Sequence, residues 1–339
     1  MVYVTDNVKK SADSFSIRDT NVLKGIAILL MLIHHLFYIQ KGLYDDIHLI
    51  KNHYLINELG VFSKLCVALF VFLSGYGLMV QTERKGGVGN LKDFYIHRFK
   101  KLFFNYWLIW IIFVPISYFL FDMTFASAYH SRIGWHLLAD ILGLHSLIFK
   151  DTYCYNPTWW FYSCIILLYF LFPAMYKLIK REALLLILCT LVISFLPIPF
   201  IDVVKFYIVA FALGMWMVHY RISPLKIGMI DLSVIIMACY CICRNFNGYP
   251  IMIDCVIALM IYIVYRSMNI PEYFKSIFSF LGKHSMNIFL FHTFIFHFWF
   301  KDIVYVSRNP PIILLTLLAI CIPISIILEW IKKYTIYRL

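Results

Sequence analysis

Runs of apolar residues separated by short polar segments recur along the whole chain. A helix needs about 20 predominantly apolar residues to cross a bilayer core of about 30 Å. Ten runs are long enough, and they predict membrane-spanning helices at residues 22–39, 59–80, 101–121, 157–178, 183–200, 203–220, 226–243, 250–265, 276–298 and 310–331. The pattern therefore predicts an all-α membrane protein, a polytopic bundle of about ten transmembrane helices.

A shorter apolar run at residues 135–149 differs from the other ten. It is too short to cross the bilayer core, and it carries His136, Asp140 and His145. Ionisable side chains are costly in hydrocarbon. We therefore expect an interfacial or re-entrant helix here.

The composition agrees with this pattern. The chain has 339 residues, of which 62% are hydrophobic and 14% charged, and its mean hydropathy is +0.80. A soluble domain would carry about 25% charged residues. The net charge of +12 would suggest a nucleic-acid partner only if the basic side chains gathered on a soluble face. They lie at the ends of the apolar runs instead, so we expect the lipid bilayer as a partner and no nucleic acid.

The distribution of Lys and Arg predicts the orientation, because these residues are enriched in cytoplasmic segments. If both termini are cytoplasmic, 20 of the Lys and Arg residues fall on the inner side and 8 on the outer side. This gives a cytoplasmic N-terminal segment at 1–21 and a short cytoplasmic tail at 332–339. The sequence has no internal repeat, long linker or low-complexity stretch, so we expect a single membrane domain over 1–339.

The nine cysteines show no paired spacing typical of a metal site. The closest candidates are Cys239, Cys241 and Cys243. Residues two apart on a helix point about 200° apart, so these three cannot share one metal ion. We expect no metal site.

The first apolar run contains LKGIAILLMLIHH, with Lys24 near one end and His34 and His35 at the other. The eleven-residue step from Lys24 to His35 turns about 1100°, within about 20° of three full turns, so both side chains share one helix face about 16 Å apart. That face could line a path from the cytoplasm to a buried imidazole. In the alternative, Lys24 marks the inner boundary and His35 is a hydrogen-bonded core histidine. His34 points about 100° away, and we expect it to have a structural role.

A second cluster of cations follows the second run. Arg98 and Lys101 are three residues apart, so on a helix they form one patch that could hold the phosphates of a soluble anion. The alternative is a role in orientation or contact with anionic lipids.

Several other polar or aromatic residues in the runs are candidates for a pocket. Ser74 lies among glycines, where a packing role is the simpler alternative. Trp159 and Trp160 could stack on a sugar or belong to an interfacial aromatic belt. Ser285 and His292 fall in a run too polar for a helix that faces only lipid.

Together these segments resemble the acyltransferase-3 family of integral membrane acyltransferases. The resemblance covers residues 23 to 296 and rests on LKGIAILLMLIHH, LFVFLSGYGL, DFYIHRFKKLFFNYW, NPTWWFYSCIILLYFLFP and LGKHSMNIFLFHTFIF. The family's Arg-x10-His pattern corresponds here to Lys24 and His35, and its Arg-x-x-Arg pattern to Arg98 and Lys101. Both departures keep the positive charge and lose a planar, bidentate donor. The chain resembles the stand-alone members, which have no appended esterase-like domain.

The resemblance implies an enzyme that moves an acyl group, usually acetyl from cytosolic acetyl-CoA, to a hydroxyl of a cell-surface or lipid-linked glycan. Acyl-CoA would be a co-substrate, with no permanently bound cofactor, and the location would be the bacterial cytoplasmic membrane. Lys24, Arg98 and Lys101 would bind acyl-CoA, and His35 would be catalytic, either as a general base or as an acyl carrier. The residues assign no carboxylate to orient His35; the candidates are Asp45, Asp46, Glu58 and Asp254.

Two other classes of protein fit the same pattern. A transporter or flippase for a glycan or small solute would also place polar residues inside its spans. However, the sequence shows no matched pair of broken spans in two halves. A structural or sensory membrane protein would tolerate replacement of His35 and Arg98.

Overall fold

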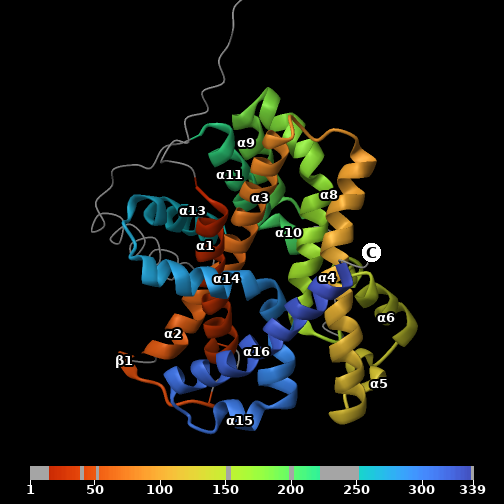
Figure 1. Ribbon diagram of the computed structural model, residues 1–339, viewed down its shortest axis with the longest axis vertical. Coiled ribbons are helices and arrows are strands. Elements are labelled where there is room, and N and C mark those ends of the chain that lie inside the picture. Colours follow the sequence, from red (N-terminus) through yellow and green to blue (C-terminus); the bar gives the residue numbers. More distant parts are fainter. Residues whose placement is uncertain are drawn as a thin grey trace, which may run out of the picture.

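The computed structural model describes residues 15–38, 42–50, 53–149, 154–197, 202–221 and 252–336. Within these ranges the chain is mainly helical, and Figure 1 shows several helices running along the long axis of the molecule. The two strands described, β1 (His48–Ile50) and β2 (His53–Tyr54), form a small antiparallel pair between the first two spans. The helices of the first half are α1 (Ile17–Ile33), α2 (Leu55–Phe62), α3 (Cys66–Arg84), α4 (Leu91–Leu120), α5 (Phe125–Tyr129), α6 (Ile133–Ile141), α7 (His145–Ile148) and α8 (Trp160–Arg181).

The second half continues with mostly shorter helices: α9 (Ala183–Phe195), α10 (Asp202–Lys205), α11 (Ile208–His219), α13 (Met252–Ser267), α14 (Glu272–Thr293), α15 (Lys301–Tyr305) and α16 (Pro310–Ile336). Two π-helical segments extend longer helices, η1 (His34–Tyr38) after α1 and η5 (Phe294–Trp299) after α14. The 3₁₀ turns η2 (Ser63–Leu65) and η3 (Pro157–Trp159) precede α3 and α8.

Five helical segments are long and apolar enough to cross a membrane, and each coincides with a predicted span. They are Ile17–Tyr38, Leu55–Arg84, Leu91–Leu120, Pro157–Arg181 and Pro310–Thr335. The prediction of a polytopic α-helical membrane protein is therefore confirmed.

Of the remaining predicted spans, three correspond to shorter helices and one to a helix of 22 residues that is richer in polar side chains. Spans 183–200 and 250–265 correspond to α9 and α13, span 203–220 to α10 and α11, and span 276–298 to α14 with η5. Span 226–243, with Cys239, Cys241 and Cys243, lies outside the described residues. The number of ten spans and the cytoplasmic position of both termini stay predictions.

Helix α4 begins ten residues before the span predicted from its apolar run. Asn90 caps it, because its side-chain oxygen accepts from the backbone N–H groups of Lys92 and, more weakly, Asp93. The polar stretch that follows the cap is thus helical. Arg98 and Lys101 consequently lie on one continuous helix with the membrane-spanning part.

Glycine pairs bring two helix pairs into close contact. A Cβ atom on Gly25 of α1 would lie 2.0 Å from the Phe278 oxygen, and one on Gly282 of α14 would lie 1.8 Å from the Asn21 oxygen. Gly75 of α3 and Gly214 of α11 face each other's helix backbone in the same way. Small residues permit this approach in membrane helices. The α1–α14 pair therefore has little freedom to shift, and it carries much of the candidate site.

The run at 135–149 forms two short helices, α6 and α7. Their His136 Nδ1 and His145 Nε2 atoms lie 2.9 Å apart. Asp140 is buried, and one of its oxygens accepts both the Tyr129 hydroxyl at 2.9 Å and the Tyr155 N–H at 3.0 Å. Burial raises the pKa of Asp140 to about 6 in spite of these hydrogen bonds. The position of these helices at a membrane interface stays a prediction.

Candidate active site

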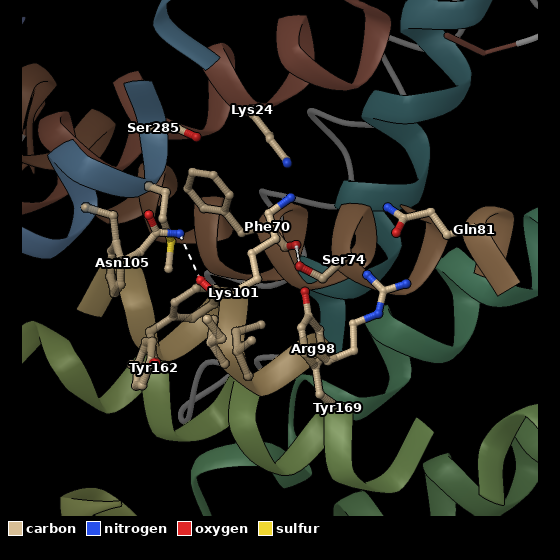
Figure 2. A pocket seen from close by; sticks show the side chains of 15 residues that line it. Lys24, Phe70, Ser74, Gln81, Arg98, Lys101, Asn105, Tyr162, Tyr169 and Ser285 are labelled. Carbon is tan, nitrogen blue, oxygen red and sulfur yellow. Dashed lines mark hydrogen bonds between the residues drawn. The ribbon is translucent and has the colours of Figure 1, made fainter. Parts of the chain in front are cut away.

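A cavity of about 300 Å³ lies where α1, α3, α4, α8 and α14 meet. Figure 2 shows the side chains that line it. Five predicted site residues from four of these helices meet here: Lys24, Ser74, Arg98, Lys101 and Ser285. The other lining residues are Phe70, Gln81, Leu102, Asn105, Phe161, Tyr162, Ile165, Tyr169, Met286 and Phe289.

The charge of this cavity is positive. Lys24, Arg98 and Lys101 line it, and the residues found to line it include no Asp or Glu. In Figure 2 the ammonium groups of Lys24 and Lys101 point toward the same space from opposite sides. Like charges held together at a partly dehydrated site repel each other strongly unless an anion lies between them. The arrangement is therefore suited to an anionic ligand.

The two serines of the cavity are committed to their own helices. The Ser74 hydroxyl donates to the Phe70 oxygen at 2.8 Å, and the Ser285 hydroxyl donates to the Gly282 oxygen at 2.8 Å. Each hydroxyl has one proton. These serines therefore offer acceptor lone pairs to the cavity.

A wider basic cleft of about 690 Å³ adjoins the cavity and shares Lys101, Asn105 and Met286 with it. Its other lining residues are His97, Lys100, Phe104, Lys283, Glu329, Lys332 and Lys333. Glu329 is its one acidic residue among those described, and it is paired with Lys332 at 2.8 Å. Most of the positive charge of the cleft is thus left for a ligand.

His35 lies in η1 and lines a small cavity of about 30 Å³ together with Met31, Cys66, Val67, Phe70, Thr158, Trp160, Phe161 and Phe289. Three of these residues, Phe70, Phe161 and Phe289, also line the cationic cavity. We call these three phenylalanines the aromatic partition. Lys24 lines the cavity on one side of it, and His35 lines the cavity on the other. π-Helical turns are frequent at functional sites, because they change which side chains face inward.

The neighbouring histidines have different surroundings. His34 is buried, and its Nδ1 donates to the Gly60 oxygen at 2.8 Å, which is a contact with α2. His292 at the end of α14 is also buried, and its ring centroid lies 5.1 Å from that of His35. His34 thus holds two helices together, whereas His292 faces the candidate catalytic group.

The two tryptophans also have different surroundings. Trp160 lines the small cavity with His35. Trp159 is buried, and its indole N–H donates to the Leu290 oxygen at 2.9 Å, so it joins η3 to α14. Successive residues of a helix point about 100° apart, which explains why only one of them reaches the cavity.

Comparison with known proteins shows the family to which the chain belongs. The model of a family described as an acyltransferase domain matches residues 17–330, nearly the whole chain. The chain belongs to this acyltransferase family. It is therefore a multi-pass membrane acyltransferase, and the alternative of a transporter is not favoured. No curated protein and no solved structure matches the chain.

Two of the four carboxylates considered as partners of His35 in this acyltransferase have other contacts. Asp45 pairs with Arg308 at 2.8 Å, and Asp46 accepts from the backbone N–H groups at Ile56 and Asn57, where α2 begins. Among the described residues, the ring contacts of His35 are with His34, His292 and Phe296. His292 is thus a ring neighbour of the candidate catalytic histidine.

Several lining residues were not predicted from the sequence. Phe70, Phe161 and Phe289 lie in runs that are apolar all round, where one Phe cannot be distinguished from another. Asn105 had a usable signal, because it follows Lys101 by one helical turn and its amide donates to the Lys101 oxygen at 3.2 Å. Thr158 also had one, as a polar residue between Pro157 and the tryptophans.

Proposed function

We propose that this acyltransferase moves an acetyl group from cytosolic acetyl-CoA to a hydroxyl of a cell-surface or lipid-linked glycan in the cytoplasmic membrane of a bacterium. The observation that carries the proposal is the meeting of three cations, Lys24, Arg98 and Lys101, in one cavity separated from His35 by three phenylalanines. An acyl-CoA has the matching form, because its phosphates lie at one end and its thioester at the other.

The cations would hold the donor. Phosphates prefer fixed cationic donors, and Arg98 offers a planar fork while the lysines offer point charges. Lys100 and Lys283 of the adjoining cleft would extend the same field toward the nucleotide end. Gln81, Asn105 and Tyr169 add uncharged polar groups to the wall. The pantetheine arm would then pass the partition toward His35.

The reaction needs one proton to be removed and one returned. A ring nitrogen of His35 takes the proton of the acceptor hydroxyl while the oxygen attacks the thioester carbon. The carbon–sulfur bond breaks, and the imidazolium returns the proton to the leaving thiolate. In a second route His35 attacks the thioester first and passes the acyl group on. Both routes use the same side chain and give the same products.

The test is acetyl transfer by purified protein in liposomes supplied with radiolabelled acetyl-CoA and surface polysaccharide. We expect wild-type protein to label the polysaccharide and His35→Ala to lose at least 10²-fold in rate. Lys24→Gln should raise KM for acetyl-CoA, with Lys92→Gln on the exposed start of α4 as the matched charge control. Labelling that is unaffected by His35→Ala would overturn the proposal.

The acceptor is identified separately by mass spectrometry of surface glycans from cells with and without the protein. We expect acetyl esters to disappear from one glycan when the protein is removed, and to return with wild-type protein but not with His35→Ala. An unchanged ester content together with altered export of an unmodified glycan would favour the transporter instead.

A further inference from the structure

A chain of hydrogen bonds behind His35 fixes the protonation of His292. The Nδ1 atom of His292 lies 3.0 Å from the Ile288 oxygen and 2.9 Å from the Phe289 oxygen. Carbonyl oxygens only accept, so Nδ1 must carry a proton. In a neutral imidazole the other nitrogen, Nε2, then has a free lone pair.

The threonines beside this ring reach that lone pair only through one long contact. Thr158 donates its one proton to the Asn156 side-chain oxygen at 2.7 Å. Asn156 is held in this orientation because its amide donates to the Leu290 oxygen. The 3.2 Å contact between the Thr158 and Thr293 hydroxyls therefore has Thr293 as donor. Thr293 keeps only a long 3.4 Å contact to His292 Nε2.

His292 Nε2 is thus a buried acceptor whose one partner among the described residues is distant, and the His292 side chain is 0% exposed. The ring beside it is that of His35, with centroids 5.1 Å apart and planes inclined by 54°. Hydrogen bonds of catalytic groups are often long in a ligand-free site and tighten when substrate binds. The rings are therefore close enough for a hydrogen bond that requires His35 to turn a ring N–H toward this acceptor.

We propose that His292 is a positioning residue that accepts a hydrogen bond from one ring nitrogen of His35. This bond keeps the proton of His35 on the side of His292 and leaves the other ring nitrogen unprotonated toward the small cavity. Which nitrogen of a histidine carries the proton is decided by the partner of the other. The inference rests on the proposed function, since it assigns how His35 is kept in the basic form.

His34 supplies an internal comparison. Its ring also contacts His35, with centroids 5.3 Å apart, and its Nδ1 also donates to a carbonyl. However, it stacks on the exposed Tyr38 and takes no part in the hydrogen bonds that link Thr158 and Thr293 to His292. We therefore expect His34 to be dispensable for the reaction.

The experiment compares three variants in the liposome assay. Asn keeps an amide donor near the position of Nδ1 but has no atom at Nε2, whereas Gln can place its oxygen near Nε2. We expect His292→Asn to lower kcat about 100-fold with KM for acetyl-CoA within about twofold. His292→Gln should recover activity to within about tenfold of wild type, and His34→Asn should match wild type.

Folding is checked for each variant by thermal unfolding in detergent. Activity of His292→Asn equal to wild type would overturn the inference, as would equal losses in His292→Asn and His34→Asn. A folded His292→Gln as inactive as His292→Asn would also overturn it. If His35→Ala is inactive while His292→Asn is active, the inference fails alone; if His35→Ala is active, the proposed function fails with it.

Discussion

The carboxyl group of Asp140 allows a test of the fold around the segment that leads into α8. It is buried between α5 and the segment that leads into α8, and one oxygen accepts from both Tyr129 and Tyr155. Tyr155 directly precedes Asn156, which begins the hydrogen-bond chain to His292. The change to test is Asp140→Asn, because the Asn oxygen can keep both hydrogen bonds while the side chain no longer ionises.

The magnitude follows from the pKa. Burial raises the pKa of Asp140 from 3.8 to about 6, and each pH unit between these values corresponds to about 1.4 kcal/mol. Because the folded protein binds this proton more tightly than the unfolded chain, the stabilisation is fully present below pH 3.8 and is lost as pH rises through 6. The wild-type protein should therefore lose roughly 2.5 kcal/mol relative to Asp140→Asn between pH 4 and pH 7. A constant offset from the new amide group does not alter this difference.

The assay is thermal unfolding of both proteins in detergent at half-unit steps from pH 4 to pH 7.5. At about 2 °C per kcal/mol for a chain of this size, the unfolding temperature of Asp140→Asn should rise relative to wild type by roughly 5 °C over this range. A difference that stays constant with pH, or that changes in the opposite direction, would refute the reasoning.

Three further outcomes follow from the packing and the charges. Gly282→Ala should lower both the unfolding temperature and the activity, because the new methyl group meets the Asn21 backbone. Overpacking of this kind costs about 1–3 kcal/mol or more. An unchanged unfolding temperature would contradict the tight α1–α14 contact. Lys283→Gln should raise KM for acetyl-CoA and leave kcat unchanged, with Lys92→Gln as its control in the same steady-state assay. Raising the ionic strength should increase KM of the wild-type protein more than that of Lys283→Gln, since exposed charges are screened by salt; equal increases would argue against the cleft as a phosphate site.

The elements that could be predicted from the sequence are the helices that coincide with long, uninterrupted apolar runs. The five long spans are predictable because a run of about 20 apolar residues rarely forms anything except a membrane-spanning helix. The apolar pattern predicts that α4 starts at residue 101, whereas it starts at Leu91, because its first ten residues are polar and are held in the helix by the Asn90 cap. Shorter runs form helices such as α9 and α11, whose length alone does not establish a span.

In the candidate site, too, some features could be predicted from the sequence and others could not. The spacing of Lys24 and His35, and of Arg98 and Lys101, predicts shared faces, and the structure places three of these side chains around one cavity. The contact of His35 with His292 joins the first span to the ninth, and no spacing along the chain encodes such a distance. The π-helical turns η1 and η5 also escape a pattern based on 3.6 residues per turn.

The aromatic partition separates the cavity suited to the phosphates of the donor from the cavity that contains His35. Cations gather on one side of Phe70, Phe161 and Phe289, while His35, Thr158 and Trp160 lie on the other. A thioester that reaches His35 would leave its phosphates behind in the cationic cavity, so the three phenylalanines would close around the slender pantetheine arm. Under the proposed function, apolar walls at that point would exclude water, which would otherwise compete with the acceptor hydroxyl for the acyl group. The acceptor would then approach from the side of Trp160, whose indole face is suited to a sugar ring, and the two substrates would meet at His35 without sharing an entrance.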